Sequence, residues 1–165
     1  MYKDKNIKIT IVDDDPQMTM MLNDFIMRTF PAAEVMDYET GEAALGNMAE
    51  SPDVIILDYH LDSVESDAMN GLEVHQKLKE RYPKVPIIFL SNQERIEVAA
   101  NTIKFGAYDY IVKNESAFHR IEILLNNIFG HAELKRNLGT QKFFNRLLVL
   151  LLIAFIIGFI VVRMK

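Results

Sequence analysis

The sequence contains no cysteine. This absence excludes disulfide frameworks, thiolate metal sites and cysteine nucleophiles, and it is consistent with a reducing cytosol. The first 129 residues have few positive charges: they carry 12 Lys and Arg against 22 Asp and Glu, so their net charge is −10. No helix-turn-helix, zinc-finger or aromatic-stacking pattern is present, and an acidic domain repels a phosphate backbone. We therefore do not expect the chain to bind nucleic acid.

The chain does have enough apolar material for one folded domain. Its 165 residues are 50% hydrophobic and 25% charged, a composition that argues against disorder. Residues 130 to 165 differ from the rest, because six Lys and Arg stand there against one acid, Glu133, giving a net charge of +5. An acidic part followed by a basic part indicates two environments.

The basic part contains a continuous apolar run, LLVLLLIAFIIGFIVV, from Leu147 to Val162, with two phenylalanines shortly upstream. A helix that is hydrophobic all round is buried in a large core or in lipid, and a domain of this size has no such core. Residues 143–163 as a helix would measure about 30 Å, which is the thickness of the hydrocarbon layer. We predict a single transmembrane helix at 143–163 after a basic linker at 131–142. A core helix or an oligomerisation strip is the alternative.

The N-terminus, MYKDKNIKITIV, has no long apolar region and runs directly into a strand pattern, so we do not interpret it as a signal peptide. The basic residues before the apolar run outnumber those after it, in agreement with the positive-inside rule. The predicted topology is a cytoplasmic domain at residues 1–130, anchored to the membrane by one C-terminal helix.

Apolar segments alternate with amphipathic segments along residues 1–130. Five short runs rich in β-branched residues predict strands, and the segments between and after them have helical spacing. Strands as apolar as VIILD and PIIFL, separated by a helix, indicate a parallel sheet covered on both faces, a doubly wound α/β fold. The predicted strands are Ile7–Val12, Glu34–Tyr38, Val54–Leu57, Val85–Leu90 and Tyr108–Val112, and the predicted helices are Pro16–Phe30, Gly41–Glu50, Gly71–Tyr82, Glu94–Phe105 and Ser116–Phe129.

Polar side chains follow four of these strands, at the point where each strand ends. Because the carboxyl ends of parallel strands meet at one edge of the sheet, where such folds bind ligands, these side chains should share one pocket. Crowded carboxylates are costly unless a divalent cation joins them, and oxygen ligands favour Mg²⁺. A carboxylate can also attack phosphorus, with a lysine and a hydroxyl as partners for the phosphoryl oxygens. The side chains are Asp13, Asp14 and Asp15 after the first strand, Asp58 at the end of the third, Ser91 and Asn92 after the fourth, and Lys113 after the fifth.

Each of these residues has an ordinary structural use when it is taken alone. The run Asp13 to Asp15 before Pro16 is equally typical of a helix N-cap with proline in the first turn. Asp58 could cap a strand end, and Lys113 could be a solvated charge. The four histidines lack the spacing of metal ligands, so we interpret them as surface or packing residues. It is the convergence of four strand ends that favours a functional site.

Four segments, IVDDDP, VIILDYHLD, PIIFLSN and GAYDYIVKN, resemble the signature segments of the receiver domains of two-component signalling, and the resemblance covers residues 6 to 129. It implies a flavodoxin-like five-stranded sheet with strand order 2-1-3-4-5, a phosphoryl group accepted from a histidine kinase or phosphotransfer protein, and no separate substrate turnover. We hypothesise that phosphorylation at Asp58 draws Ser91 and Tyr110 inward and alters the surface built from the fourth helix, fifth strand and fifth helix. The site residues that it implies are Asp58 as the phosphoacceptor, Asp13, Asp14, Asp58 and the backbone carbonyl of His60 as Mg²⁺ ligands, and Ser91, Lys113 and Tyr110 as phosphate-binding and switch residues.

Three features depart from that pattern. The polar stretch Ser63 to Ala68 is an insertion beside the phosphoacceptor, where it could change the docking of a kinase. Asn114 follows the lysine where the family has a proline, which is commonly cis. A cis bond before another residue costs about 2.5 to 4 kcal/mol, so we expect a trans bond. Asp62 replaces a proline in the loop after the phosphoacceptor.

The resulting prediction is a stand-alone, membrane-anchored response regulator receiver in a phosphorelay, which signals by altered protein binding. One alternative is a membrane docking module that is not phosphorylated. The other is an aspartate-nucleophile phosphohydrolase of the haloacid-dehalogenase type, whose first motif Asp13 and Asp15 fit. Gln17 stands where that family has threonine or valine, and no second acidic pair follows Lys113, so we expect no such enzyme.

Overall fold

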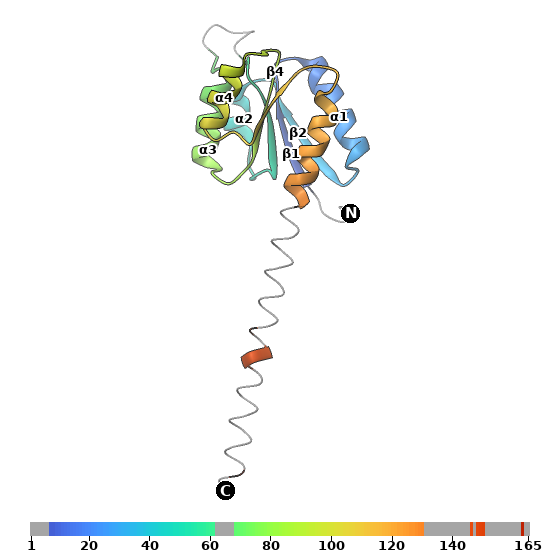
Figure 1. The fold of residues 1–165 in the computed structure, drawn as a ribbon, viewed down its shortest axis with the longest axis vertical. Coiled ribbons are helices and arrows are strands. Elements are labelled where there is room, and N and C mark those ends of the chain that lie inside the picture. Colours follow the sequence, from blue (N-terminus) through green and yellow to red (C-terminus); the bar gives the residue numbers. More distant parts are fainter. Residues whose placement is uncertain (1–6, 62–67, 131–145, 147, 151–162, 164–165) are drawn as a thin grey trace. The chain divides into compact units, whose positions relative to one another are not determined.

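The computed structural model describes residues 7–61, 68–130, 146, 148–150 and 163, which Figure 1 shows as a coloured ribbon. Internal contacts divide the chain into two units, Met1–Asn126 and Asn127–Lys165. The sheet and the functional residues described below belong to the first unit.

Three predicted segments lie mostly outside the described residues. They are the insertion at Ser63 to Ala68, the basic linker at 131–142 and the transmembrane helix at 143–163, of which the structure describes Ala68, Arg146, Leu148 to Leu150 and Arg163. In the part of the chain that is described, no helix is both long and apolar enough to cross a membrane. The linker and the anchor therefore stay predictions.

Strands and helices alternate along the domain, as the sequence predicts. The predicted order of elements is confirmed, and most bounds agree closely. The strands are β1 (Ile7–Val12), β2 (Ala33–Tyr38), β3 (Val54–Asp58), β4 (Ile87–Ser91) and β5 (Asp109–Val112), and the helices are α1 (Pro16–Thr29), α2 (Gly41–Asn47), α3 (Gly71–Arg81), α4 (Ile96–Lys104) and a helix at 117–130.

The start of β4 differs from the prediction. The apolar pattern begins at Val85, but the strand begins at Ile87. Pro86 has no N–H to donate to a neighbouring strand, although its carbonyl oxygen still accepts a hydrogen bond from the Ile55 N–H at 3.0 Å. Hydropathy alone does not register this missing donor, so the predicted strand is too long at this end.

All five strands are parallel and form one sheet in the order β2-β1-β3-β4-β5. This order confirms the predicted doubly wound α/β fold. β3 and β4 are buried along their whole length, which explains why continuous apolar runs predict them. The chain reverses its direction of travel across the sheet at β1 and β3, and the carboxyl ends of these strands are where such folds bind ligands.

Helices cover both faces of the sheet, with α1 and the helix at 117–130 on one face and α2, α3 and α4 on the other (Figure 1). On the first face the rings of Phe25 and Phe118 pack edge to face, with centroids 5.2 Å apart. On the second face Leu57 and Phe89 of the sheet lie in one buried cluster with Val74 of α3. Because successive side chains of a strand point to opposite faces, the central strands supply both cores.

Two helix caps hold the backbone beside the strand ends. At the start of α1 the Asp15 carboxylate accepts hydrogen bonds from the N–H groups of Gln17 at 2.9 Å and Met18 at 3.3 Å. The N-cap interpretation is therefore correct for Asp15. At the start of α3, Asn70 and Glu73 form a capping box. Both caps lie at the edge of the sheet that carries the candidate site.

Candidate functional site

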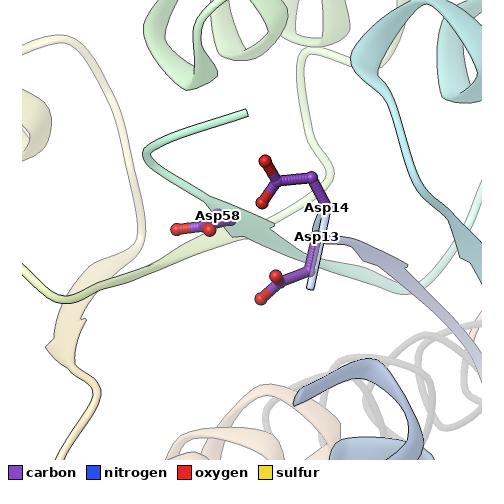
Figure 2. Close-up of side chains that lie close together, drawn as sticks. All are labelled: Asp13, Asp14 and Asp58. Atoms are coloured by element: carbon purple, nitrogen blue, oxygen red, sulfur yellow. The ribbon is translucent and has the colours of Figure 1, made fainter. Parts of the chain in front are cut away.

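Three acidic side chains meet at the carboxyl ends of β1 and β3. Asp13 and Asp14 directly follow β1, and Asp58 ends β3, the neighbouring strand in the sheet. Figure 2 shows the three side chains gathered at these two strand ends. One carboxylate oxygen from each residue lies within 4.8 Å of the others. Asp13 and Asp58 are only 2% and 4% exposed, whereas Asp14 is half-buried.

Lys113 brings one positive charge to this group. Its Nζ donates hydrogen bonds to Asp13 Oδ2 at 2.9 Å and to Asp58 Oδ2 at 3.0 Å, and all three side chains are buried. The backbone N–H of Lys113 donates to the Ser91 carbonyl oxygen at 2.8 Å, which ties the end of β5 to the end of β4. One lysine against three carboxylates leaves the site with an excess of negative charge.

The pKa values of Asp13, Asp14 and Lys113 are shifted because these groups are partly buried and lie close to other charges. Burial raises the pKa of Asp13, the charge of Asp58 raises it further, and the hydrogen bond from Lys113 opposes both. Burial also raises the pKa of Asp14, again with a contribution from Asp58. For Lys113, burial lowers the pKa, but the attraction of Asp13 and Asp58 outweighs it and the net pKa is raised. The charged form of Lys113 is favoured, whereas the charged forms of Asp13 and Asp14 are disfavoured.

The donor set fits a hard divalent cation. In the described part of the chain this is the one group of at least three acidic or histidine side chains with ligand atoms so close together. All of its donors are carboxylate oxygens, which are ligands for Mg²⁺ or Ca²⁺ and not for soft metals. A bound cation would supply the positive charge that Lys113 alone does not.

The backbone after β3 holds the Asp58 carboxylate in place. The His60 N–H donates to Asp58 Oδ1 at 3.3 Å, while Lys113 occupies the other oxygen. Gly71, at the start of α3, packs directly against this backbone: a Cβ on Gly71 would lie 2.3 Å from the Asp58 carbonyl oxygen. Gly71 was not among the predicted site residues, although a glycine at the first position of a predicted helix is a signal of close backbone approach.

Ser91 and Tyr110 lie beside the carboxylates and are linked to each other through Gln93. Ser91 is fully buried at the end of β4, and its Oγ accepts a hydrogen bond from the Gln93 N–H at 3.0 Å. The Tyr110 hydroxyl donates to the Gln93 carbonyl oxygen at 2.8 Å. Burial raises the pKa of Tyr110, and a hydrogen bond with Ser91 opposes the rise. Tyr110 is 6% exposed, so its side chain is packed inside the domain.

The structure also describes the Lys113–Asn114 peptide bond and the histidines His60 and His75. No peptide bond among the described residues is cis, so the Lys113–Asn114 bond is trans, as expected. The His60 side chain is exposed, and its ring contacts that of Tyr59 with centroids 5.0 Å apart. His75, interpreted from the sequence as a surface or packing residue, is a packing residue with 1% exposure.

Curated relatives share this domain within longer proteins. An NtrX-like response regulator of Rickettsia bellii is 36% identical over 133 residues, which cover 79% of this chain and 26% of that protein. The nitrogen assimilation regulatory protein NtrX of Azorhizobium caulinodans is 29% identical over 135 residues, covering 81% and 28%. A protein-glutamate methylesterase/protein-glutamine glutaminase of Geobacillus kaustophilus is 37% identical over 114 residues, covering 66% and 30%. The chain spans less than a third of the length of each of these relatives.

Solved structures show the same fold, and a family model gives its name. NtrX from Brucella abortus superposes with a TM-score of 0.69 at 24% identity, covering 82% of this chain and 30% of that one. The BeF3-activated receiver domain of DrrB, an OmpR/PhoB homologue of Thermotoga maritima, superposes with a TM-score of 0.66 at 24% identity, covering 76% and 99%. The model of the response regulator receiver domain matches residues 9–124. Because that match spans well over half of the sequence and includes every residue of the site, the chain belongs to the response regulator receiver family.

Proposed function

We propose that the domain accepts a phosphoryl group on Asp58 and that Mg²⁺ is held by Asp13, Asp14, Asp58 and the backbone carbonyl of His60. The observation that supports this most directly is the buried contact of Lys113 with both Asp13 and Asp58, at 2.9 and 3.0 Å, beside a third carboxylate. This arrangement combines a nucleophile, a fixed cation and a surplus of oxygen ligands.

Each residue then has a separable task in the transfer. An Asp58 oxygen attacks phosphorus, a new O–P bond forms, and the bond from phosphorus to the donor breaks with its electron pair leaving on the donor. Mg²⁺, when bound, neutralises charge on the carboxylates and on the phosphoryl group. Lys113 can exchange its contact with Asp58 for a phosphoryl oxygen, and the Ser91 hydroxyl, already at the end of β4, can donate to another.

The donor that we propose is a histidine kinase or a phosphotransfer protein. A cavity of about 340 Å³ adjoins Lys113 between α1 and the helix at 117–130 and offers an apolar seat for such a partner beside the site. Part of the exposed surface of α1 is also apolar, since Met20 and Met21 are 69% and 51% exposed. The residues lining the cavity include Met18, Met21, Leu22, Leu90, Phe118 and Ile121.

The output that we propose is altered protein binding. The described residues form one receiver fold, and the relatives with this domain carry different names, from a nitrogen regulator to a methylesterase. Their activities therefore do not transfer to this chain. No separate substrate turnover is expected, and the phosphohydrolase alternative gains no support from Asp15, whose carboxylate caps α1.

Membrane attachment through residues 143–163 is also part of the proposal. It is supported by the apolar run of the sequence and by Leu148, Val149 and Leu150, which are helical and 61%, 53% and 64% exposed. Three successive exposed apolar side chains on a helix are costly in water and favourable in lipid. In this arrangement the receiver would lie on the cytoplasmic side, where a kinase can reach it.

The test of phosphorylation is incorporation measured by intact mass. The full chain is incubated with Mg²⁺ and a small acyl phosphate, beside Asp58→Asn and a sample with a chelator. A gain of one phosphoryl group that requires Mg²⁺ and is lost in Asp58→Asn is the expected result. A folded chain that gains no phosphoryl group from either the acyl phosphate or a kinase would favour the docking module that is not phosphorylated.

A further inference from the structure

The described chain resumes at Ala68, after residues 62–67, and the next three backbone N–H groups, those of Met69, Asn70 and Gly71, each have a partner. The Gly71 N–H donates to the Tyr59 carbonyl oxygen at 3.1 Å, and the Asn70 N–H donates to Glu73 Oε2 at 3.1 Å. Both partners are close to these residues in sequence, because Tyr59 directly follows β3 and Glu73 lies in the first turn of α3.

The third partner comes from a different part of the sheet. The Met69 N–H donates to Glu42 Oε1 at 2.8 Å, across 27 residues of sequence. Glu42 lies in the first turn of α2, and its side chain reaches out to the returning chain. This contact joins Met69 to α2, an element outside both the loop and α3.

Hydrogen bonds from the end of α3 also hold the C-terminal end of α2 in place. Arg81 donates from Nη1 to the Leu45 carbonyl oxygen at 2.6 Å and from Nη2 to the Met48 carbonyl oxygen at 3.0 Å. The Tyr82 hydroxyl donates to the same Met48 oxygen at 3.1 Å. These bonds satisfy carbonyl groups that the end of a helix leaves unpaired, and they fasten α2 to α3.

The position of the returning chain acts directly on the site. Gly71 packs so closely that a Cβ there would lie 2.3 Å from the Asp58 carbonyl oxygen and 2.8 Å from the Tyr59 carbonyl oxygen. His60, the proposed carbonyl ligand of the metal, is the next residue of that backbone. This close packing and the Gly71 N–H bond to the Tyr59 carbonyl oxygen couple Gly71 to the backbone that follows Asp58.

We propose that Glu42 is a positioning residue for the metal site: by binding the Met69 N–H it fixes the exit of the insertion against the Asp58 to His60 backbone and so holds the His60 carbonyl in place for Mg²⁺. The proposal rests on the proposed function. The affinity for the cation then depends on a contact from α2.

The experiment compares Glu42→Ala, Glu42→Gln and Glu97→Ala in the full chain, with Mg²⁺ binding measured by calorimetry. Glu97 is the matched control because it is an exposed acid in the first turn of α4. Glu42→Ala should raise the Mg²⁺ dissociation constant about tenfold, the lower end of the range for residues that orient metal ligands. Glu42→Gln keeps an acceptor oxygen and should restore most of the affinity, and Glu97→Ala should bind as the unchanged chain does.

Hydrogen exchange of the Met69 amide in the absence of Mg²⁺ separates this proposal from the proposed function. Glu42→Ala should speed that exchange whether or not the site binds metal. An unchanged exchange rate, or a Mg²⁺ affinity equal to that of the unchanged chain, would overturn the role of Glu42. Failure of the unchanged chain to bind Mg²⁺, with Met69 exchange still sensitive to Glu42, would instead count against the proposed metal site.

Discussion

Asp14 is the most exposed of the three carboxylates, since it is half-buried whereas Asp13 and Asp58 are 2% and 4% exposed. Burial, and after it the charge of Asp58, raise the pKa of Asp14 above the ordinary value of an aspartate, although a backbone hydrogen bond and the charge of Lys113 oppose the rise. The ionised form of Asp14 therefore destabilises the fold at neutral pH in the absence of a cation. Asp14→Asn should raise the free energy of unfolding by a few tenths to about 1 kcal/mol, a small effect because water screens this partly exposed group. Chemical denaturation of the receiver domain without Mg²⁺ measures the change.

Two conditions sharpen the test on Asp14. A carboxyl group with a raised folded-state pKa binds its proton in the folded protein before the unfolded one, so the difference between the two proteins should shrink as the pH falls toward 3.8. Saturating Mg²⁺ should reverse the order, because the unchanged chain binds the cation with one more ligand. An equal stability of the two proteins at pH 7 without Mg²⁺ would contradict the account.

His75 is the second residue whose charge state bears on stability. It is 1% exposed, its ring packs on Phe89 with centroids 5.2 Å apart, and among the described residues neither ring nitrogen has a well-formed hydrogen bond. Burial lowers its pKa below 6.5, the charge of Lys79 lowers it further, and the backbone of Gly106 opposes. The unfolded chain binds this proton more readily than the folded one. Stability should therefore be complete above pH 6.5 and fall as the pH drops below it.

The matched variants for this effect are His75→Leu and His119→Leu. His75→Leu removes two buried polar atoms with little change of volume and should stabilise the domain by about 1 kcal/mol or more, with a flatter stability profile between pH 5 and 7. His119 is exposed and contacts Glu122 at 3.8 Å on the surface of its helix, so its replacement should change the stability much less than that of His75. Urea denaturation at a series of pH values gives the result, and a steep profile retained in His75→Leu would show that another group is responsible.

Several site residues could be predicted from the sequence because their role depends on where a strand ends. Asp13, Asp58 and Lys113 each come at the carboxyl end of an apolar run, and parallel strands bring such ends together. Glu42 and Gly71 could not be placed at the site in the same way. Glu42 acts through a contact over 27 residues, and Gly71 acts by lacking a side chain, and neither property shows in hydropathy or charge.

At the scale of elements, the approach of α3 to β3 depends on Gly71. A Cβ at this position would lie 2.3 Å from the Asp58 carbonyl oxygen, a backbone atom that cannot turn aside. Gly71→Ala should therefore destabilise the domain by about 1 to 3 kcal/mol through the shift that it forces. It should also weaken Mg²⁺ binding, because the shift displaces the backbone of the site. Thermal unfolding and calorimetry measure the two effects.

Gly46 in α2 provides the opposite case. A Cβ there meets no atom within 4 Å, and the residue is exposed within a helix. Gly46→Ala should stabilise the domain by about 0.5 to 1 kcal/mol through its lower backbone entropy, with no effect on Mg²⁺ binding. If the two alanine variants had similar stability, steric contact at Gly71 would not be the cause.

The elements themselves were predicted well where one signal dominates. β3 and β4 are buried throughout and read as unbroken apolar runs, and Pro16 with Asp15 predicts the start of α1. The ends of strands and helices were predicted less well where hydrogen bonds, and not hydropathy, set the boundary. The missing N–H of Pro86 delays β4, and the end of α2 at Asn47 depends on α3, a tertiary partner that local sequence does not name.

At the scale of the whole molecule, the net charges of the two parts of the sequence bear on how an anchored receiver would meet a membrane surface. Residues 1–129 carry a net charge of −10, which disfavours contact with an anionic lipid surface, whereas the following residues carry +5. The helix at 117–130 begins four residues after Lys113 and extends for about 20 Å at 1.5 Å per residue. The start of this helix is therefore close in sequence to Lys113, which contacts Asp58.

Anchoring should therefore leave the chemistry of the site unchanged. We expect the full chain in vesicles of neutral phosphatidylcholine to gain a phosphoryl group from a small acyl phosphate at the rate of residues 1–130 in solution, within about twofold, because neutral lipid does not repel the anionic donor. Full-chain Asp58→Asn in the same vesicles gives the background. Co-flotation of the full chain with the vesicles, and its loss in residues 1–130, tests the anchor itself. A rate many times lower in vesicles would mean that the site faces the lipid, and a full chain that does not float would remove residues 143–163 as an anchor while leaving the proposed role of Asp58 intact.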